Sequence, residues 1–259
     1  MRLDVYLAPS ELTPTALDGR VVAVIDVLRA TTTIAAALHN GARTVIPFLE
    51  TEDAVRTAKL YERGEVKLAG ERHMVVIPGF DLGNSPLEFT EAAVGQQTVL
   101  LTTSNGTRAL LAAEDAKTVL VASYANFSVT VERLDAALAG GHPVAIVCAA
   151  SDGAPSLEDS ACAGRFVAAL RATQTALPIN DAGQMCELLA ARYGDDIAAL
   201  FRDASHGRAL QAAGFDQDLQ ACATVDLYPV LAEFSERAIV RATASATVTA
   251  NATVADRGV

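Results

Sequence analysis

The sequence predicts an α/β protein in which a mainly parallel sheet lies between two layers of helices, a three-layer α/β/α arrangement. Two observations carry this prediction. Strand-like and helical segments alternate through about the first 170 residues, which favours parallel strands joined by helical crossovers. The run Val21–Ile25 is apolar without alternation, as expected of a strand buried on both faces. We expect a single domain over residues 1–250, compatible with two lobes, followed by a polar tail over residues 251–259.

Seven strands are expected before the chain becomes mostly helical. They are predicted over residues 3–7, 21–25, 44–48, 66–69, 98–103, 118–123 and 143–149. Helices are predicted over 31–40, where Gly41 is a natural stop, over 51–63, where Thr51 is the expected cap, after Arg108, over 126–138 and from about residue 156. A helical insertion over 176–213 is expected to form a cap or second lobe. A final alternating segment, 236–250, is β-like.

Composition excludes several classes of partner. The 259 residues carry 20 basic and 31 acidic side chains, a net charge of -11, which argues against nucleic acid and acidic membranes as partners. A small anionic substrate is not excluded, because a site can be locally basic. The four cysteines form no C-x-x-C pair and indicate free thiols in a reducing compartment. With no signal peptide or spanning run, we expect a cytoplasmic protein, and the sequence is compatible with a homo-oligomer.

Asp26 and Arg29 lie between the end of the central strand and the start of the helix that follows it. In open α/β sheets this is the position at which ligands bind. The first turn of the helix offers free N–H groups and the hydroxyls of Thr31, Thr32 and Thr33, which suit a phosphate. The alternative is that Asp26 only caps the helix and Arg29 is solvated.

Polar clusters follow four of the predicted strands: Asp26/Arg29, Glu71/Arg72, Ser104 to Arg108, and Asp152 with Glu158/Asp159. If these strands are parallel, the clusters share one edge of the sheet. Carboxylates suit Mg²⁺, which binds through one or two of them plus phosphate oxygens, and arginine suits the phosphate itself. The combination indicates metal-assisted phosphate ester chemistry.

Each cluster also has a structural interpretation. Ser85 to Glu88 and Ser156 to Asp159 resemble capping boxes, and Ser104 to Thr107 could be only a turn and cap. A lone His206 between helices is more often structural than catalytic. The phosphate loop G-x-x-x-x-G-K-[ST], the dinucleotide fingerprint G-x-G-x-x-G and the nucleophile elbow G-x-S-x-G are all missing from the sequence.

Several strings make the chain similar to the 2-phosphosulfolactate phosphatase family. They are Ile25-Asp-Val-Leu-Arg-Ala-Thr-Thr-Thr33, Ala69-Gly-Glu-Arg72, Pro78-Gly-Phe-Asp-Leu-Gly-Asn-Ser-Pro86, Thr102-Thr-Ser-Asn-Gly-Thr-Arg108, Ser156-Leu-Glu-Asp159 with Cys162-Ala-Gly164, and Ser205-His-Gly-Arg208. The resemblance spans roughly residues 1–230, with a mild departure at Ser160-Ala161. It implies a Mg²⁺-dependent phosphatase acting on phosphate monoesters of 2-hydroxy acids, named for a step in coenzyme M biosynthesis.

The site residues follow from combining the clusters with this resemblance. Asp26 is expected to be either a Mg²⁺ ligand or the nucleophile, and both roles stay open. Glu71 and Asp81 are the further metal candidates, with Glu158 and Asp159 next. Arg29 and Asp159 are expected to be catalytic. Phosphate is expected to bind Arg29 and the Thr31–Thr33 turn from one side, and from the other side Ser104, Asn105, Gly106, Thr107 and Arg108.

Two basic positions remain for a second anion on the substrate. Arg72 and the Ser205–Arg208 segment, with His206 and Arg208, are assigned to its carboxylate or sulfonate. The alternative is that Arg72 pairs with Glu71 and that Arg208 pairs with Asp203. At the level of function, the alternative to an enzyme is a non-catalytic sensor that binds an anionic phosphometabolite.

Overall fold

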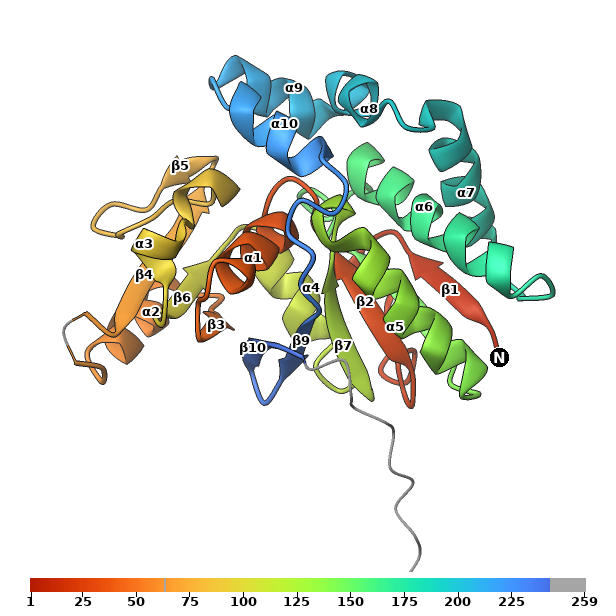
Figure 1. The fold of residues 1–259 in the computed structure, drawn as a ribbon, viewed down its shortest axis with the longest axis horizontal. Coiled ribbons are helices and arrows are strands. Elements are labelled where there is room, and N and C mark those ends of the chain that lie inside the picture. Colours follow the sequence, from red (N-terminus) through yellow and green to blue (C-terminus); the bar gives the residue numbers. More distant parts are fainter. Residues whose placement is uncertain (63, 243–259) are drawn as a thin grey trace, which may run out of the picture.

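The computed structural model describes residues 1–62 and 64–242 and shows an α/β protein built on one ten-stranded sheet (Figure 1). The strand order is β1-β8-β2-β7-β9-β10-β3-β6-β4-β5. The strands are β1 Leu3–Tyr6, β2 Val21–Ile25, β3 Thr44–Pro47, β4 Val66–Arg72, β5 Val75–Val76, β6 Thr98–Thr102, β7 Thr118–Ala122, β8 Val144–Cys148, β9 Ala232–Ser235 and β10 Ala238–Arg241. All seven strands expected in the first 150 residues are present.

The α-helices of the described chain follow the strands in the alternation that the sequence predicts. They are α1 Ala30–His39, α2 Thr51–Ala58, α3 Glu91–Val94, α4 Gly106–Ala112, α5 Phe127–Ala139, α6 Leu157–Thr173, α7 Asp181–Tyr193, α8 Ile197–Asp203, α9 Ser205–Ala212 and α10 Asp216–Ala223. Three short 3₁₀ turns add to them, η1 Pro9–Glu11, η2 Pro86–Glu88 and η3 Tyr124–Asn126. Within the described residues, no helix is long and apolar enough to cross a membrane.

The central strand β2 is buried on both faces, as its unalternating sequence predicts. Val21, Ala23 and Ile25 belong to one hydrophobic core, which includes side chains of α5 and α6. Val22 and Val24 belong to a second core on the opposite face, which α1 and α4 cover. Two cores on opposite faces of one sheet make a three-layer α/β/α architecture.

The sheet consists of two parallel groups joined by a hairpin. Strands β1, β8, β2 and β7 are mutually parallel, as are β3, β6 and β4. The hairpin β9–β10 is antiparallel to β7 on one side and to β3 on the other, where the pairing is the single residue pair Ile239–Val45. From β7 to β3 the sheet passes through three antiparallel pairings, β7 with β9, β9 with β10, and β10 with β3. The strands of the second group therefore run antiparallel to those of the first. Strand direction alone therefore aligns the loops only within each group, but the loops of both groups meet at one pocket, described below.

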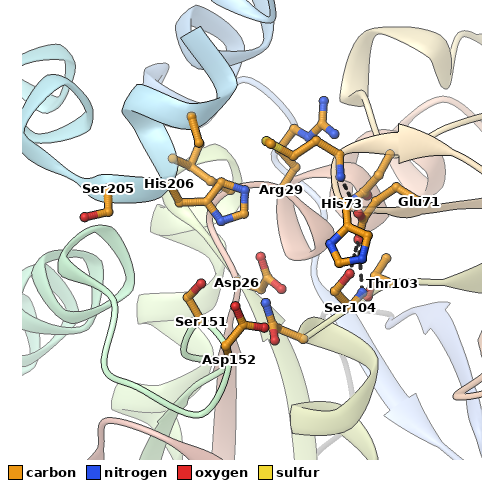
Figure 2. Close-up of a pocket in the computed structure, with 15 residues that line it drawn as sticks. Asp26, Arg29, Glu71, His73, Thr103, Ser104, Ser151, Asp152, Ser205 and His206 are labelled. Atoms are coloured by element: carbon orange, nitrogen blue, oxygen red, sulfur yellow. Dashed lines mark hydrogen bonds between the residues drawn. The ribbon is translucent and has the colours of Figure 1, made fainter. Parts of the chain in front are cut away.

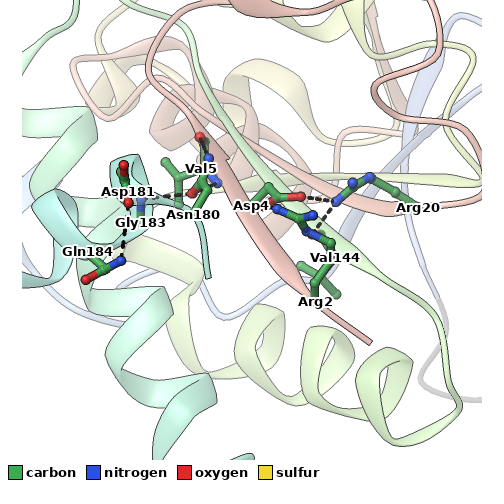
Figure 3. Close-up of polar contacts among 9 residues, drawn as sticks. All are labelled: Arg2, Asp4, Val5, Arg20, Val144, Asn180, Asp181, Gly183 and Gln184. Carbon is green, nitrogen blue, oxygen red and sulfur yellow. Dashed lines mark hydrogen bonds and ion pairs between the residues drawn. The ribbon is translucent and has the colours of Figure 1, made fainter. Parts of the chain in front are cut away.

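The edge strand β1 is covered by the segment that precedes α7 (Figure 3). Leu3 N donates to Pro178 O at 2.9 Å, and the Asn180 side chain both accepts from Val5 N and donates to Val5 O. The same Asn180 side chain caps α7 by accepting from Gly183 N. On the inner side, the buried Asp4 carboxylate is paired with Arg2 and Arg20. These contacts satisfy the polar groups that an exposed edge would leave free.

The C-terminal third differs from the prediction in two respects. The segment 236–250 was expected to be one β-like stretch, but Glu236 and Arg237 have φ values of 50° and 61° and form the turn of the β9–β10 hairpin. The helical stretch also continues through α10, beyond the predicted end at 213. Helix α2 ends at Ala58, earlier than the predicted residue 63. Residue 63, residues 243–250 and the predicted tail over residues 251–259 lie outside the described residues.

Candidate active site

A pocket of about 290 Å³ lies where the loops after β2, β4, β6 and β8 meet helix α9 (Figure 2). Both parallel groups of the sheet therefore contribute to it: β2 and β8 from one group, β4 and β6 from the other. The lining residues are Asp26, Leu28, Arg29, Glu71, His73, Met74, Asn84, Thr103, Ser104, Asn105, Ser151, Asp152, Ser205, His206 and Ala209.

The Asp26 carboxylate projects into the middle of this pocket (Figure 2). Its backbone is fixed by Thr31, whose hydroxyl accepts from Asp26 N and donates to Asp26 O. The carboxylate Oδ1 accepts from Ala30 N at 3.3 Å, and Gly106 at the start of α4 packs so closely that a Cβ there would lie 2.7 Å from Oδ2. Burial raises the pKa of Asp26 from 3.8 to about 7, assisted by the charges of Glu71 and Glu158, while the backbone N–H groups of Ala30 and Gly106 oppose this rise.

Two further carboxylates of α6 are buried near Asp26. Asp159 accepts from Val27 N at 2.8 Å through Oδ1 and from the Ser156 hydroxyl at 2.7 Å through Oδ2. Burial, followed by the charges of Asp26 and Glu158, raises the pKa of Asp159 well above its usual value, and burial likewise raises the pKa of Glu158. Asp159 therefore holds the loop that carries Asp26, rather than capping its own helix through a capping box.

Glu71 lines the pocket on the side formed by β4 and β6. Its Oε1 accepts from the backbone N and the hydroxyl of Ser104, both at 3.0 Å, and its Oε2 accepts from Met74 N at 2.9 Å. Glu71 thereby ties the end of β4 to the loop after β6. The turn His73–Met74 that follows has positive φ at both residues, as in a tight hairpin between β4 and β5.

Ser151, Asp152 and His206 lie around Asp26 in Figure 2. Asp152 and Gly153 are the two positive-φ residues of a turn closed by the pairing of Ser151 with Ala154. His206, on α9, has its pKa lowered by burial and then by the charge of Arg29, against the opposing charges of Glu71 and Asp152. The imidazole is therefore predominantly neutral near pH 7.

Arg29 is neither solvated nor free. Its side chain is 3% exposed, and its Nη1 donates to Asp218 Oδ2 at 2.6 Å in an ion pair with α10. The guanidinium also stacks over the ring of Phe215, with 4.2 Å between the guanidinium carbon and the ring centroid. Asp218 was not predicted from the sequence, because it lies 189 residues from Arg29 and beyond the predicted end of the helical insertion.

The structure brings six of the predicted site residues to the pocket: Asp26, Arg29, Glu71, Ser104, Asn105 and His206. Thr31, Thr32 and Thr33 are fully buried behind it, and their hydroxyls donate to the backbone oxygens of Asp26, Val27 and Asn84 respectively. Thr107 forms a hydrogen bond to the Thr103 hydroxyl. Gly106 contributes by its lack of a side chain, as the contact with Asp26 shows.

Besides Asp159, the three threonines Thr31–Thr33, Gly106 and Thr107, four more predicted residues do not line the pocket. The Asp81 carboxylate accepts from Leu68 N at 2.9 Å at the side of β4. Arg72 donates to the backbone oxygens of Glu71 and Leu49, and Arg208 donates to Asp203 O and the Ser205 hydroxyl. Arg108 is exposed on α4. The alternative partners predicted for Arg72 and Arg208 were thus the correct residues, but the contacts are to backbone oxygens rather than carboxylates.

Several pocket residues had no role assigned from the sequence, among them His73, Asn84 and Asp152, although Asp152 was named as part of a polar cluster. Asn84 lies in the motif Gly83-Asn84-Ser85-Pro86, and its buried Oδ1 has no hydrogen-bond partner within the described residues. Asp152-Gly153 is a recognisable turn pair in the loop after β8. For His73 we find no signal in the sequence.

The carboxylates that line the pocket determine what kind of metal site it can form. Within residues 1–62 and 64–242, no group of three or more His, Cys, Asp or Glu side chains is arranged to hold a metal ion. Asp26, Glu71 and Asp152 nonetheless line one pocket. Mg²⁺ commonly binds through one or two carboxylates, waters and substrate phosphate oxygens. The residues therefore fit a substrate-bridged Mg²⁺ and do not fit an all-protein cage.

Comparisons with known proteins identify the family to which the chain is similar. The family model described as 2-phosphosulpholactate phosphatase matches residues 6–237. A protein of Symbiobacterium thermophilum is 43% identical over 227 residues, covering 86% of this chain and 95% of the relative. Relatives from Caldanaerobacter subterraneus subsp. tengcongensis and Clostridium acetobutylicum are 34% and 30% identical, covering 89% and 93% of this chain and 94% and 100% of their own lengths.

All three relatives carry the name "Probable 2-phosphosulfolactate phosphatase". The matched range includes the loops that follow β2, β4, β6 and β8 and the helices up to α10, so every element that lines the pocket lies within it. The chain belongs to the 2-phosphosulpholactate phosphatase family, and its enzymatic class is that of the phosphoric monoester hydrolases.

Proposed function

We propose that this enzyme is a Mg²⁺-dependent phosphatase that hydrolyses 2-phosphosulfolactate to sulfolactate and inorganic phosphate. The observation that carries the proposal is the buried Asp26 carboxylate, fixed between the starts of α1 and α4 at the centre of a polar pocket, in a chain of this family. The proposal includes the cytoplasmic location that the sequence predicts and the place in coenzyme M biosynthesis that the family resemblance implies.

The charge balance of the pocket supports a requirement for a cation. Among the described residues that line it, Arg29 is the one arginine or lysine, whereas Asp26, Glu71 and Asp152 are acidic. The proposed substrate adds a phosphate, a carboxylate and a sulfonate. Bringing these anions into a pocket with three carboxylates is unfavourable unless a divalent cation offsets the repulsion.

Asp26 is the residue that would hold Mg²⁺, with Glu71 or Asp152 as a second carboxylate. Bound there, Mg²⁺ would polarise the phosphoryl oxygens and stabilise charge that develops during transfer. The pKa of Asp26, about 7, means that a cation would also favour its ionised form. The alternative role of Asp26 is that of the nucleophile that receives the phosphoryl group before water hydrolyses the acyl phosphate.

The remaining pocket residues have proposed roles in orienting the ester. Arg29 donates to an anionic oxygen of the substrate through N–H groups that Asp218 does not occupy. His206, predominantly neutral near pH 7, carries one ring N–H that can donate a hydrogen bond to the ester oxygen and so stabilise the charge that develops there when the P–O bond breaks. The proton that this oxygen gains comes from the water that hydrolyses the ester. Ser104 and Asn105 supply hydrogen bonds from the opposite wall.

The direct test is phosphate release from 2-phosphosulfolactate by the purified chain, with and without Mg²⁺ and with EDTA. We expect turnover that requires Mg²⁺, ceases with the chelator and returns when Mg²⁺ is added in excess. Phosphoenolpyruvate and phosphorylated 2-hydroxy acids without a sulfonate serve as comparison substrates. Binding of these compounds without release of phosphate from any of them would contradict the proposal and favour the anion sensor.

A further inference from the structure

We infer that Asp218 is a positioning residue, which fixes the orientation of the Arg29 guanidinium at the pocket. This inference rests on the proposed function, because it takes Arg29 to be the cation that contacts the substrate. Asp218 lies on α10 and does not itself line the pocket that contains Asp26.

The Asp218 carboxylate is held from two sides. Its Oδ2 accepts from Arg29 Nη1 at 2.6 Å, and its Oδ1 accepts from the Ser85 hydroxyl at 2.7 Å. Arg29 and Asp218 are both nearly fully buried. Arg29 follows β2, Ser85 precedes η2 and Asp218 belongs to α10, so the network joins three segments that are distant in the sequence. An acceptor fixed in this way determines where the guanidinium plane lies.

Arg29 retains donors for a ligand. A guanidinium has five N–H bonds, and the bond to Asp218 is the one hydrogen bond that this side chain donates within the described chain. The guanidinium borders the pocket with Asp26 and also a second cavity of about 360 Å³, which shares His73, Met74 and Asn84 with the first. The stacking of Arg29 on Phe215 restricts the plane further.

Stability alone explains this arrangement poorly. Burying two charged side chains carries a desolvation penalty that their mutual attraction does not always offset, and apolar replacements of buried ion pairs often leave stability unchanged or increased. A fixed guanidinium, by contrast, presents its donors in one geometry without losing side-chain entropy when substrate binds. Retaining a buried pair at the border of a polar pocket is therefore better explained by orientation of Arg29.

The competing explanation is that the network only fastens α10 to the sheet. Both explanations predict that a variant at Asp218 melts at a lower temperature, so thermal stability does not separate them. They differ in the kinetics of the folded enzyme. A fastening role changes the folded fraction and leaves kcat and KM per folded molecule unchanged. A positioning role changes kcat and KM differently from each other.

The test is Asp218→Asn, which keeps the side chain's shape and removes its charge. Asparagine cannot form the ion pair with Arg29, so the guanidinium is held less firmly and its positive charge is no longer offset. We expect kcat for 2-phosphosulfolactate to fall at least tenfold per folded molecule. KM and the inhibition constant for inorganic phosphate should stay the same or fall, because an unpaired guanidinium attracts anions more strongly.

Two further variants complete the design. Asp218→Glu keeps the charge and should recover part of the lost kcat. Asp216→Asn, at an exposed carboxylate on the same helix, is the matched control and should leave kcat, KM and phosphate inhibition unchanged. If Asp218→Asn fails to fold, Ser85→Ala removes one anchor of the carboxylate without removing a charge, and should lower kcat two- to fivefold without raising KM.

The inference is overturned if folded Asp218→Asn, or folded Ser85→Ala where the former does not fold, keeps the wild-type kcat. A rise in KM with unchanged kcat overturns it as well. Failure of the proposed function is distinguishable, since the wild-type chain would then release no phosphate from any ester. In that event, calorimetric titration with inorganic phosphate decides the inference: tighter binding to Asp218→Asn than to the wild type supports it, and equal or weaker binding overturns it.

Discussion

Asp26 combines two properties at the scale of the single residue: nearly complete burial and hydrogen bonds that hold its carboxylate in place. Replacing it by asparagine preserves the shape and removes the charge. As either a Mg²⁺ ligand or the nucleophile, Asp26 should supply several kcal/mol of transition-state stabilisation, so Asp26→Asn should lower kcat/KM by roughly 10³-fold or more. Steady-state phosphate release measures this, and activity within tenfold of the wild type would reject both roles.

The same substitution should stabilise the metal-free protein at high pH. The folded pKa of Asp26, about 7, lies above the unfolded value of 3.8, with Glu71 and Glu158 adding to the effect of burial. The folded state then binds more protons between these values, so the free energy of unfolding falls as the pH rises from about 4 to 7. A rise from 3.8 to about 7 corresponds to about 4 kcal/mol at most.

Urea unfolding in EDTA measures this stability difference. Asp26→Asn should be more stable than the wild type at pH 8, and the advantage should narrow progressively as the pH falls to 4. An advantage that does not depend on pH would show that some change other than the removal of a buried charge causes it.

Glu71 and Asp81 were equivalent metal candidates in the sequence, and the structure separates them. Glu71 lines the pocket, whereas Asp81 binds Leu68 N at the side of β4. Glu71→Gln should therefore raise the Mg²⁺ concentration needed for half-maximal activity by tenfold or more. Asp81→Asn is the matched control and should leave the metal titration unchanged. Equal shifts in both variants would place the metal elsewhere.

At the scale of the element, the sequence predicted strands better than the turns and helix ends. The unalternating run of β2 requires burial on both faces, which the two cores provide. The β9–β10 hairpin was missed because Glu236 and Arg237 occupy its turn, where Asn-Gly or Asp-Gly would have been recognised. The Ser156–Asp159 segment resembles a capping box, an interpretation that the sequence left open, but Ser156 donates to Asp159, which in turn accepts from the loop after β2.

Gly106, at the start of α4, packs closely against the start of α1. A Cβ added at Gly106 would lie 2.5 Å from Ala30 Cβ and 2.7 Å from Asp26 Oδ2, so α4 would have to move away from α1. Gly106→Ala should reduce stability by about 1–3 kcal/mol. It should also lower kcat more than tenfold, because the Asp26 carboxylate is displaced.

Gly140→Ala is the control for this displacement, since its new Cβ would meet no heavy atom closer than 3.3 Å. It should leave kcat unchanged. Chemical denaturation and phosphate release measure both variants, and wild-type kcat in Gly106→Ala would show that the position of Asp26 tolerates a shift of α4.

At the scale of the whole molecule, the sequence located the site by strand ends and not by side-chain direction. Asp26 and Ser104 follow their strands, Glu71 lies at the end of β4, and all three reach the pocket as expected. Arg208 stands in a matching motif, yet its guanidinium turns to Asp203 O. The partner of Arg29 could not be predicted, because the contact with Asp218 depends on how α10 packs across the loop after β2. Local patterns specify where a loop begins, whereas tertiary packing decides which of its side chains point inward.

The two strand groups meet at the junction between β10 and β3. The pocket needs both groups, since Asp26 and Asp152 come from one and Glu71 and Ser104 from the other. Of the strand pairings in the described sheet, the one between β10 and β3 is the single pair Ile239–Val45, and Ile239 is fully buried. Ile239→Ala should reduce the free energy of unfolding by about 2–5 kcal/mol through the cavity it leaves.

Because this cavity lies at the junction, Ile239→Ala should also let the two walls of the pocket shift relative to each other. We expect kcat/KM of the folded variant to fall several-fold, although no pocket residue has changed. Val240→Ala, at the partly exposed neighbouring position on the same strand, should change stability by about 0.5 kcal/mol or less and leave kcat/KM unaltered. Urea unfolding and phosphate release on both variants measure the difference. Wild-type kcat/KM in folded Ile239→Ala would show that the pocket is held together by its own loop contacts, such as that between Glu71 and Ser104, and not by the hairpin.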